Sequence, residues 1–457
     1  MKNLKEISAV YFVGAGGIGM SALVRYFLSK GKKVAGYDKT ATALTTQLIG
    51  EGADIHFEDN KALIPGFCLD KENTIVIFTP AIPDNHSELS FFREEGFRLM
   101  KRAEVLGEIT KTDRGICVAG THGKTTTSSM TAHLLKQSAV DCNAFLGGIL
   151  KNYDSNLLLS ATSDLTVIEA DEYDRSFHWL RPYMAVITSS DPDHLDIYGT
   201  EEAYLESFRH FTSLIQEDGC LIVRKGITVV PDTKESVRVY TYSIEEGDFH
   251  ATNIRIGGGT ILFDFVTPKG IIADIELGVP VKINIENGIA AMALAWLNGV
   301  SDAELRAAMA SYKGAKRRFD FHLKSDKAVL LDDYAHHPEE VKASISSVKL
   351  LYPDRKLTVV FQPHLFSRTR DFYREFAEAL SLADEVILVE IYPAREEPIE
   401  GITSTIVFDL ITAGKSLILK TGLIEHLSGQ PIDVLMTLGA GDIDTYIPQI
   451  QSILEKR

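Results

Sequence analysis

One short segment constrains the fold of this chain more than any other. Residues 119–127 read AGTHGKTTT, after an apolar run at 115–118 and before a helix-like run at 128–135. A glycine-rich turn between a strand and a helix directs backbone N–H groups and the positive end of the helix toward an anion. Lys124 adds a positive charge, and the hydroxyl of Thr125 can ligate Mg²⁺. The segment therefore predicts a phosphate-binding loop within an α/β fold, with ATP as the energy source.

The loop is shorter than the full signature of such loops, which has a glycine where Val118 stands. A glycine-rich helix cap with a chance lysine is the alternative interpretation. It does not explain why the strand, the loop, the Lys-Thr pair and the helix follow one another in register, so the phosphate loop is favoured.

The composition limits the class of protein. A chain of 457 residues is too long for one core, so two or three domains are expected. The formal net charge of −16 argues against nucleic acid as the main partner, because a phosphate backbone requires a basic face. The four cysteines lie far apart, which indicates reduced thiols in a cytoplasmic protein and no zinc site. Without a signal peptide or a long apolar run, we expect no membrane insertion.

Strand-like apolar runs alternate with helix-like stretches almost throughout, which favours α/β architecture with parallel sheets. We expect a Rossmann-like domain at 1–110, a phosphate-loop ATPase domain with a parallel sheet at 111–312, and a second Rossmann-like domain at 313–457. Short alternating strands between about 237 and 277 predict a small antiparallel sheet appended to the central domain. The other predicted strands lie at residues 9–13, 33–38, 74–78, 115–118, 165–168, 185–188, 328–331, 357–361, 385–389 and 433–437.

Polar residues follow the predicted strands of the central region. Glu169 comes directly after one strand, and His194 lies in the acidic loop 191–196 after the next. An acidic side chain at the end of a parallel strand, beside a phosphate loop, is a typical Mg²⁺ ligand. Mg²⁺ prefers oxygen ligands, so His194 is equally well explained as a metal ligand and as a loop histidine that bonds to a carboxylate.

Two further polar clusters follow strands of the C-terminal region. Residues 331–338 read LDDYAHHP and can form a general-base site, a substrate clamp or a helix cap. Residues 361–370 read FQPHLFSRTR, in which Arg368 can hold a carboxylate or simply lie on the surface. The basic turn GAKRRF at 314–319 is placed to reach the phosphates of a nucleotide.

The N-terminal region has a second glycine loop, GAGGIG at 14–19, with Asp38 at the end of the following strand. This pattern fits the dinucleotide fingerprint and by itself indicates NAD and hydride transfer. A glycine loop at a helix N-terminus binds any diphosphate, however, and a UDP-sugar carries one. On the residues of this region alone, both interpretations stay open.

Taken together and in this order, the motifs resemble those of the Mur ligases, the ATP-dependent amide-bond formers of peptidoglycan synthesis. The resemblance covers essentially the whole chain. The loop GTHGKT is highly specific for the family, and DYAHHP with FQPH is similar to the branch that adds L-alanine. The motifs lie at residues 14–21, 120–127, 169–174, 193–196, 284–287, 313–319, 333–338, 361–369 and 439–442.

The resemblance implies a first domain that binds UDP-N-acetylmuramate, a central domain that binds ATP and Mg²⁺, and a last domain that binds L-alanine. By similarity, the ATP-binding residues are Gly120, Thr121, His122, Gly123, Lys124, Thr125, Thr126, Asn284, Asn287, Arg317, Arg318 and Asp333. The implied Mg²⁺ ligands are Thr125, Glu169 and His194, and the UDP-sugar residues are Gly14, Gly16, Gly17, Ile18, Gly19, Asp38 and His122. The amino-acid residues are Tyr334, His336, His364 and Arg368, and the catalytic residues are Lys124, Glu169, His194 and His336.

The implied reaction joins L-alanine to the carboxylate of UDP-N-acetylmuramic acid through an acyl phosphate. Such a route requires charge neutralisation and positioning, which agrees with a sequence that has no nucleophilic Ser or Cys motif. Leu365 stands where the family usually has an arginine, so recognition of the alanine carboxylate is expected to depend on Arg368 and the histidines. We expect a cytoplasmic monomer or homodimer.

Three alternative functions account for fewer of these motifs. A ligase that reattaches a recycled tripeptide to the same sugar nucleotide shares the phosphate loop, but residues 361–369 argue against it. An NAD oxidoreductase needs only the first domain and leaves the loop around Lys124 unexplained. A non-catalytic nucleotide-binding regulator would leave the polar clusters at the strand ends without a role.

Overall fold

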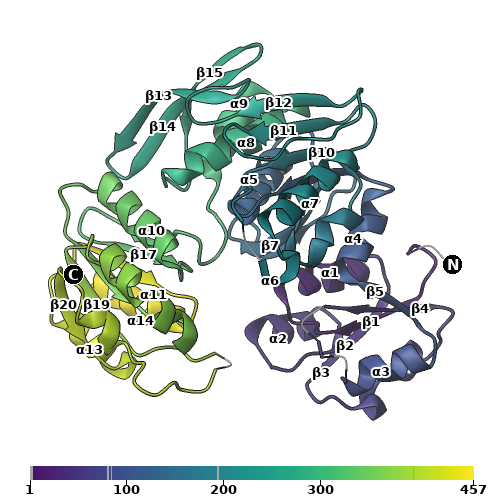
Figure 1. Ribbon diagram of the computed structural model, residues 1–457, viewed down its shortest axis with the longest axis horizontal. Coiled ribbons are helices and arrows are strands. Elements are labelled where there is room, and N and C mark those ends of the chain that lie inside the picture. Colours follow the sequence, from purple (N-terminus) through teal and green to yellow (C-terminus); the bar gives the residue numbers. More distant parts are fainter. Residues whose placement is uncertain (1–3, 80–81, 84, 193–194, 395, 457) are drawn as a thin grey trace. The chain divides into compact units, whose positions relative to one another are not determined.

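The computed structural model describes residues 4–79, 82–83, 85–192, 195–394 and 396–456. Parallel sheets flanked by helices make up most of the chain, so the predicted α/β class is confirmed (Figure 1). The chain divides into two compact units. The first consists of Met1–Thr252, Phe265–Ala273 and Glu286–Ser311, and the second of Asn253–Asp264, Asp274–Ile285 and Tyr312–Arg457. The finer division into three domains stays a prediction.

The first unit begins with a five-stranded sheet in the order β3-β2-β1-β4-β5, in which every pairing is parallel. All residues of its central strand β1 are buried, because Val10 and Phe12 pack with α1 on one face and Tyr11 and Val13 pack with α3 on the other. The elements are β1 (Ala9–Val13), α1 (Ile18–Ser29), β2 (Lys33–Tyr37), α2 (Ala43–Gly50), β3 (Asp54–His56), β4 (Thr74–Phe78), α3 (Ser87–Glu94), β5 (Arg98–Lys101) and α4 (Arg102–Thr110), with short 3₁₀ helices η1 (Lys61–Leu63) and η2 (Gly66–Cys68).

The second sheet of this unit has seven strands in the order β12-β11-β10-β6-β9-β7-β8. β6 leads into the phosphate loop and lies between β10 and β9, so the ends of these two strands flank the loop. The elements are β6 (Arg114–Ala119), α5 (Lys124–Lys136), β7 (Asn143–Leu150), β8 (Ser155–Leu158), β9 (Leu165–Glu169), η3 (Tyr173–Trp179), β10 (Pro182–Ile187), α6 (Leu195–Tyr198), α7 (Glu201–Ser213), β11 (Cys220–Arg224), β12 (Arg238–Tyr242), α8 (Ile283–Leu297) and α9 (Asp302–Ser311).

The predicted antiparallel sheet is confirmed for only part of the region 237–277. β13 (His250–Gly257), β14 (Thr260–Thr267) and β15 (Gly270–Glu276) form a separate three-stranded sheet. β12, the first strand of the region, instead pairs in parallel with β11 at the edge of the seven-stranded sheet. The alternation of apolar and polar residues is the same for an edge strand of either sheet, so the sequence pattern does not distinguish them.

The second unit is built around a six-stranded sheet in the order β16-β17-β21-β18-β19-β20. Only the edge pairing of β16 with β17 is antiparallel. The elements are β16 (Asp320–Lys324), β17 (Val329–Asp333), α10 (Pro338–Leu351), β18 (Leu357–Phe361), α11 (Phe366–Leu380), β19 (Glu385–Leu388), α12 (Thr405–Phe408), β20 (Gly414–Leu417), η4 (Lys420–Gly422), α13 (Leu423–Ser428), β21 (Val434–Leu438), η5 (Ile443–Tyr446) and α14 (Ile447–Glu455).

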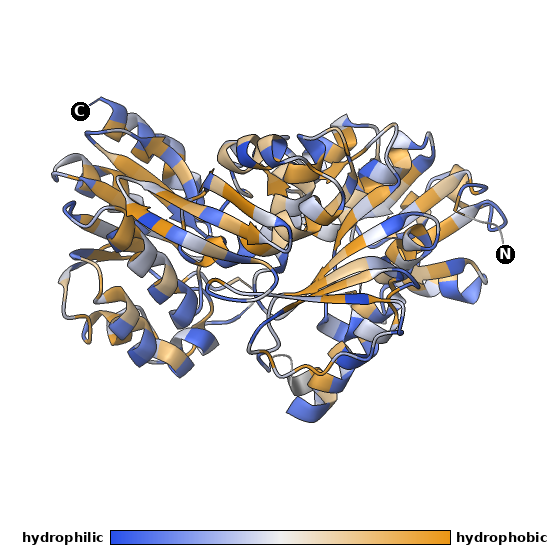
Figure 2. Ribbon diagram, turned by 90° about the horizontal axis from the view of Figure 1, so that it is seen from above, coloured by the Kyte–Doolittle hydropathy of each residue, from blue (hydrophilic) through white to orange (hydrophobic). Residues whose placement is uncertain are grey.

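Hydropathy follows this layering. Figure 2 shows predominantly hydrophobic strands and helices whose residues alternate between hydrophobic and hydrophilic. Burial of the strands on both faces is typical of parallel sheets that helices cover on both sides. The four cysteines are buried free thiols. Within the described part of the chain, every helix is too short or too polar to cross a membrane.

The packing of α4 against η3 gives a test of this fold. A Cβ on Gly107 would lie 2.5 Å from the carbonyl oxygen of Trp179. Because that backbone atom cannot rotate away, we expect Gly107→Ala to destabilise the protein by about 1–3 kcal/mol. Gly50→Ala is the control, since none of the described atoms lies within 4 Å of its added methyl group. Thermal unfolding should show a lower Tm for Gly107→Ala alone, and equal Tm values would contradict this packing.

Candidate active site

The phosphate loop is held in shape by two glycines and a threonine. Gly120 has φ +136°, and Gly123, the N-cap of α5, has φ +82°, a region that favours glycine. A Cβ on Gly120 would lie 2.1 Å from Oγ1 of Thr188, so no side chain fits there. The Thr188 hydroxyl lies 3.1 Å from the carbonyl oxygen of Ala119 and 2.5 Å from that of His122. These contacts tie both ends of the loop to the end of β10.

Residues just beyond β10 hold the loop further. The backbone N–H of His122 donates to Oγ of Ser189 at 2.7 Å, and the hydroxyl of Thr121 donates to the carbonyl oxygen of Asp191 at 2.7 Å. The side chain of His122 is itself exposed. The outline of the loop is thus fixed by contacts within the protein, as electrostatic preorganisation requires.

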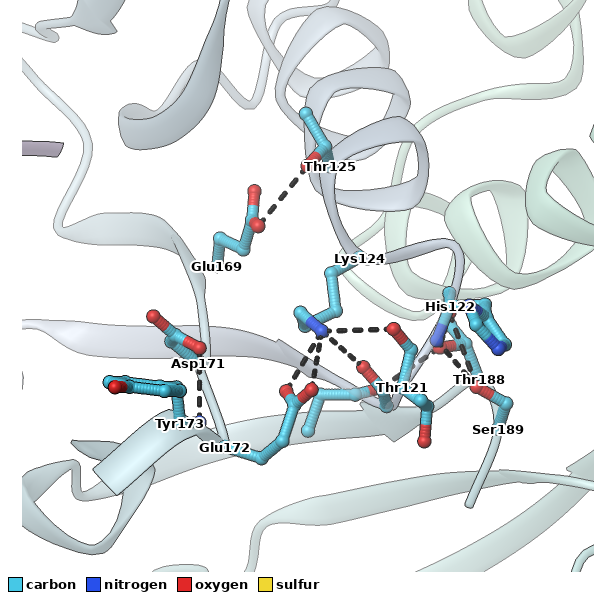
Figure 3. A network of polar contacts seen from close by, with 12 residues as sticks. Thr121, His122, Lys124, Thr125, Glu169, Asp171, Glu172, Tyr173, Thr188 and Ser189 are labelled. Atoms are coloured by element: carbon cyan, nitrogen blue, oxygen red, sulfur yellow. Dashed lines mark hydrogen bonds and ion pairs between the residues drawn. The ribbon is translucent and has the colours of Figure 1, made fainter. Parts of the chain in front are cut away.

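The ammonium group of Lys124 lies inside this loop (Figure 3). Its Nζ donates to the carbonyl oxygens of Gly120 at 2.6 Å and Thr121 at 3.1 Å, and to the carboxylate of Glu172 at 2.8 Å. Only 14% of the Lys124 side chain is exposed. Thr126 lies in the same first turn of α5. A largely buried positive charge at a helix N-terminus provides a site for phosphate oxygens.

Glu169, the last residue of β9, carries an unsatisfied oxygen beside the start of α5. The hydroxyl of Thr125 donates to its Oε1 at 3.1 Å, whereas Oε2 is buried without a hydrogen-bond partner among the described residues. A Cβ on Gly147 would lie 2.1 Å from Oε2, so glycine leaves the room that the carboxylate occupies. Burial raises the pKa of Glu169. The Thr125 hydroxyl and the Glu169 carboxylate are suitable oxygen ligands for Mg²⁺. This ion uses few protein ligands and completes its coordination shell with phosphates and water.

The third predicted metal ligand, His194, lies outside the described residues, so its role stays a prediction. Within the described part of the chain, no three His, Cys, Asp or Glu side chains gather closely enough to hold a metal.

The two predicted asparagines lie one turn apart on α8. Oδ1 of Asn287 accepts the hydroxyl of Thr127 at 3.3 Å. A Cβ on Gly123 would lie 2.7 Å from the same oxygen, so this asparagine contacts the loop. The division between the two units crosses α8 after Ile285, so Asn284 belongs to the second unit, where its Nδ2 donates to the carbonyl oxygen of Val279 at 3.2 Å.

The glycine loop of the first sheet is closed by Asp38. Gly14 has φ +92°, and its N–H donates to the carbonyl oxygen of Tyr37 at 2.8 Å. The N–H of Gly16 donates to Oδ2 of Asp38 at 2.7 Å. The carboxylate that the fingerprint places at the end of the second strand therefore braces the loop itself.

The start of α1 borders a cation from α4. Gly17 is the N-cap of α1. Among the described residues, no side chain caps the backbone N–H groups of the first turn of this helix, which begins at Ile18. A Cβ on Gly19 would lie 2.3 Å from the guanidinium group of Arg102, which forms an ion pair with Asp171 at 3.2 Å. Uncapped N–H groups at a helix N-terminus suit a diphosphate.

In the second unit, the two arginines of the basic turn have different surroundings. The guanidinium group of Arg317 donates to the carbonyl oxygens of Gly439 at 2.5 Å and Gly441 at 3.0 Å. Both guanidinium groups lie over the ring of Tyr334, Arg317 at 4.9 Å and Arg318 at 5.5 Å from its centre. Arg317 thus supports the backbone of this unit, and Arg318 is the better candidate for a phosphate contact.

A row of aromatic and basic side chains continues from Tyr334. Its ring centre lies 5.2 Å from that of His336, which lies 6.1 Å from that of His364. Arg368 NH1 lies 3.3 Å from Nδ1 of His364. Burial lowers the pKa of His336, and burial together with the charge of Arg368 lowers the pKa of His364 to about 4. Leu365 has φ +71°, a strained value for a residue with a side chain that is typical of functional loops.

Asp333, predicted to bind ATP, ends β17 next to this row. Burial raises its pKa to about 6, and the nearby positive charge of Arg318 opposes that rise. The hydroxyl of Ser344 donates to its Oδ2. The structure therefore brings Asp333, Arg318 and the four predicted amino-acid residues into one neighbourhood of the second unit.

Several residues of these sites are not among the site residues that the sequence predicts, although Glu172 lies within the motif at 169–174. Thr188 and Ser189 hold the phosphate loop, and Glu172 pairs with its lysine. The ring of Tyr392 stacks on His364 with 5.8 Å between ring centres. Each of them lies shortly after the end of a strand, and that position was the signal that could have identified them.

The fold and these sites define an α/β nucleotide-binding protein with a phosphate loop. Residues 9–114 match the family model described as Mur ligase family, catalytic domain. Residues 118–295 match the Mur ligase middle domain, and residues 317–441 match the Mur ligase, glutamate ligase domain. The chain belongs to the Mur ligase family, which confirms the resemblance in its motifs.

Similar proteins cover the full length of the chain. A UDP-N-acetylmuramate–L-alanine ligase of Parabacteroides distasonis is 63% identical over 457 residues, which are 100% of this chain and 99% of the relative. A ligase of the same name from Porphyromonas gingivalis is 54% identical over 98% of this chain and 99% of its own. The crystal structure of a UDP-N-acetylmuramate-alanine ligase from Thermotoga maritima matches with a TM-score of 0.81 at 26% identity, over 98% of both chains.

The pairing of His364 with Arg368 predicts a pH dependence. The pKa of His364 is about 4 in the folded protein, against about 6.5 for an unperturbed histidine. The unfolded chain therefore binds the extra proton, and the contribution of His364 to stability is lost as pH falls through this window. We expect Arg368→Gln to raise the pKa of His364, because it removes the neighbouring positive charge. NMR titration of ¹³C-labelled histidines measures this pKa.

The matched control for this titration is Arg370→Gln. Arg370 lies two residues further along α11, is exposed, and pairs with Asp371. This variant should leave the pKa of His364 unchanged. Equal pKa values in the two variants would contradict the pairing.

Proposed function

We propose that this chain joins L-alanine to the carboxylate of UDP-N-acetylmuramate, with conversion of ATP to ADP and phosphate, in the synthesis of peptidoglycan precursors. The observation that carries the proposal is the phosphate loop, where Lys124, Thr125 and Glu169 meet at the carboxyl edge of one sheet. Relatives that are 63% and 54% identical along the whole chain bear the name of this ligase.

ATP binds at the loop in this proposal, with its phosphates on the backbone N–H groups and Lys124. Mg²⁺ would be held by Thr125, Glu169 and His194. The buried Oε2 of Glu169 would be the carboxylate ligand of the ion. When bound, the ion neutralises negative charge on the phosphates. Asn284 and Asn287 are proposed to lie near the adenine.

The reaction has two steps. A carboxylate oxygen of UDP-N-acetylmuramate attacks the γ-phosphorus of ATP, which gives ADP and an acyl phosphate. The amine of L-alanine then attacks the carbonyl carbon, loses a proton, and phosphate leaves. Lys124 stabilises the charge on the phosphoryl oxygens throughout, so the protein supplies positioning and electrostatic stabilisation rather than a covalent nucleophile.

His336 is suited to accept the proton of the alanine ammonium group. Its Nδ1 lies 2.9 Å from the carbonyl oxygen of Tyr334, which can only accept, so Nδ1 carries the proton and Nε2 is the basic atom. Burial lowers the pKa of His336, which keeps the ring neutral and able to act as a base at neutral pH. Arg368 and His364 are proposed to hold the carboxylate of L-alanine, and Arg318 to contact phosphate.

The first glycine loop is proposed to hold the diphosphate of the UDP-sugar, on the N–H groups at the start of α1. Asp38 braces this loop through Gly16. Because ATP and UDP-sugars are cytoplasmic metabolites, we place the reaction in the cytoplasm. Monomer or homodimer remains a prediction.

The proposal is tested by phosphate release from ATP and Mg²⁺ with UDP-N-acetylmuramate, when L-alanine, glycine, L-serine and the recycled tripeptide are supplied in turn. We expect turnover that prefers L-alanine. Turnover only with the tripeptide would assign the chain to the recycling reaction instead. Absence of turnover with every acceptor would contradict the ligase function.

A single substitution tests the ATP site. We expect Lys124→Ala to abolish ADP formation, because it removes the charge on the phosphoryl oxygens, while UDP-N-acetylmuramate still binds in calorimetry. The control is Lys136→Ala at the other end of the same helix, where the lysine pairs with Asp141. If Lys124→Ala turns over like the control, the loop is not the ATP site.

A further inference from the structure

The ammonium group of Lys124 already uses its three donors. Its acceptors are the carbonyl oxygens of Gly120 and Thr121 and the carboxylate of Glu172. An ammonium group has three N–H bonds, so a phosphate oxygen binds Nζ only by displacing one of these acceptors. Both carboxylate oxygens of Glu172 lie 2.8 Å from Nζ. The carboxylate is the one charged acceptor of the three, and it therefore competes most directly with phosphate.

The turn at Glu172 is built to keep the carboxylate in this place. The side chain of Glu172 is 1% exposed, and its carbonyl oxygen accepts the hydroxyl of Tyr198 at 2.5 Å and the N–H of Arg175 at 3.0 Å. Asp174 and Arg175 have consecutive φ values of +51° and +54°. Two such strained residues persist only where their surroundings fix them.

Two cationic side chains, Lys101 at the end of β5 and Arg102 at the start of α4, form ion pairs with the other two carboxylates of the same turn. Lys101 pairs with Asp174 at 2.6 Å, and Arg102 pairs with Asp171 at 3.2 Å. The side chains of Asp171 and Asp174 are 37% and 35% exposed. The partly exposed carboxylates of the turn thus bind partly exposed cations, while its buried carboxylate, Glu172, binds the lysine of the phosphate loop.

We propose that Glu172 is a positioning residue that holds Lys124 against the loop until nucleotide arrives, and that the nucleotide phosphates then replace it as the partner of the ammonium group. This inference rests on the proposed ATP site. Glu172 and the phosphates are two anions that compete for one largely buried cation. In such a low-dielectric setting the competition weakens nucleotide binding appreciably.

The two glutamates at the end of β9 and just after it have opposite relations to the nucleotide. Glu169 has a buried oxygen without a hydrogen-bond partner among the described residues, so it is suited to a cation that arrives with the phosphates. Glu172 is already neutralised by Lys124 and loses that partner in the exchange. Burial raises the pKa of Glu172, which agrees with a carboxylate that is costly to leave charged without its lysine.

Glu172→Gln separates competition from structural support. Glutamine keeps the size of the side chain and an acceptor oxygen for Nζ, but it removes the negative charge. We expect the Kd of ADP, measured by calorimetry in EDTA, to fall by about fivefold or more, as typical couplings between sites allow. Structural damage to the loop would weaken binding, so tighter binding cannot result from misfolding.

Asp171→Asn is the matched control, since it makes the same chemical change one residue earlier, on an exposed carboxylate that binds Arg102. Its Kd for ADP should stay within about twofold of the wild-type value, because exposed ion pairs contribute little. If the wild-type protein binds no ADP, both the proposed function and the inference fail. If it binds ADP but Glu172→Gln binds equally or more weakly, only the inference fails. Weaker binding confined to Mg²⁺-containing buffer would make Glu172 a metal ligand and would also overturn the inference.

Discussion

The close approach of Gly120 to Thr188 is the constraint on which the rest of the active site depends. It allows the chain to leave β6, turn beneath the end of β10 and enter α5 within four residues. The Thr188 hydroxyl then lies within hydrogen-bond distance of the carbonyl oxygens of Ala119 and His122. A side chain at residue 120 would push the loop away from the sheet edge, and with it the N–H groups, Lys124 and the start of the helix. The proposed phosphate binding therefore depends first on backbone geometry and second on side-chain charge.

The charged side chains around this loop are not all paired in the same way. Lys124 is neutralised by a buried glutamate, whereas Glu169 keeps an oxygen without a hydrogen-bond partner among the described residues, an arrangement that suits the proposed binding of a cation together with phosphates. The second unit carries polar groups of another kind, the imidazole of His336, whose pKa is lowered by burial, and the guanidinium group of Arg368. Chemistry that activates a carboxylate with ATP and then delivers an amine requires both sets, because phosphoryl transfer needs charge neutralisation and amide formation needs a base.

Much of the fold could be predicted from the sequence, because strands buried on both faces appear as continuous apolar runs. The predicted phosphate loop is present as a turn between β6 and α5, and its functional residues stay predictions. Where the pattern is ambiguous the sequence did not suffice. β12 joins the parallel sheet, although its alternation equally suits the antiparallel one. Arg317 and Arg318 are adjacent and chemically identical, and only the fold shows that Arg317 supports the backbone. The partner of Lys124 lies 48 residues away, a distance that no local motif spans.

The central claim is that the loop activates a carboxylate by transfer of the γ-phosphoryl group. An isotope experiment tests it most directly. UDP-N-acetylmuramate with ¹⁸O in its carboxylate is incubated with the enzyme, ATP, Mg²⁺ and L-alanine, and the released phosphate is examined by ³¹P NMR. An acyl phosphate requires that one carboxylate oxygen leaves with the phosphate, so each phosphate formed should carry one ¹⁸O from the substrate. Unlabelled phosphate, formed together with the amide product, would contradict the account.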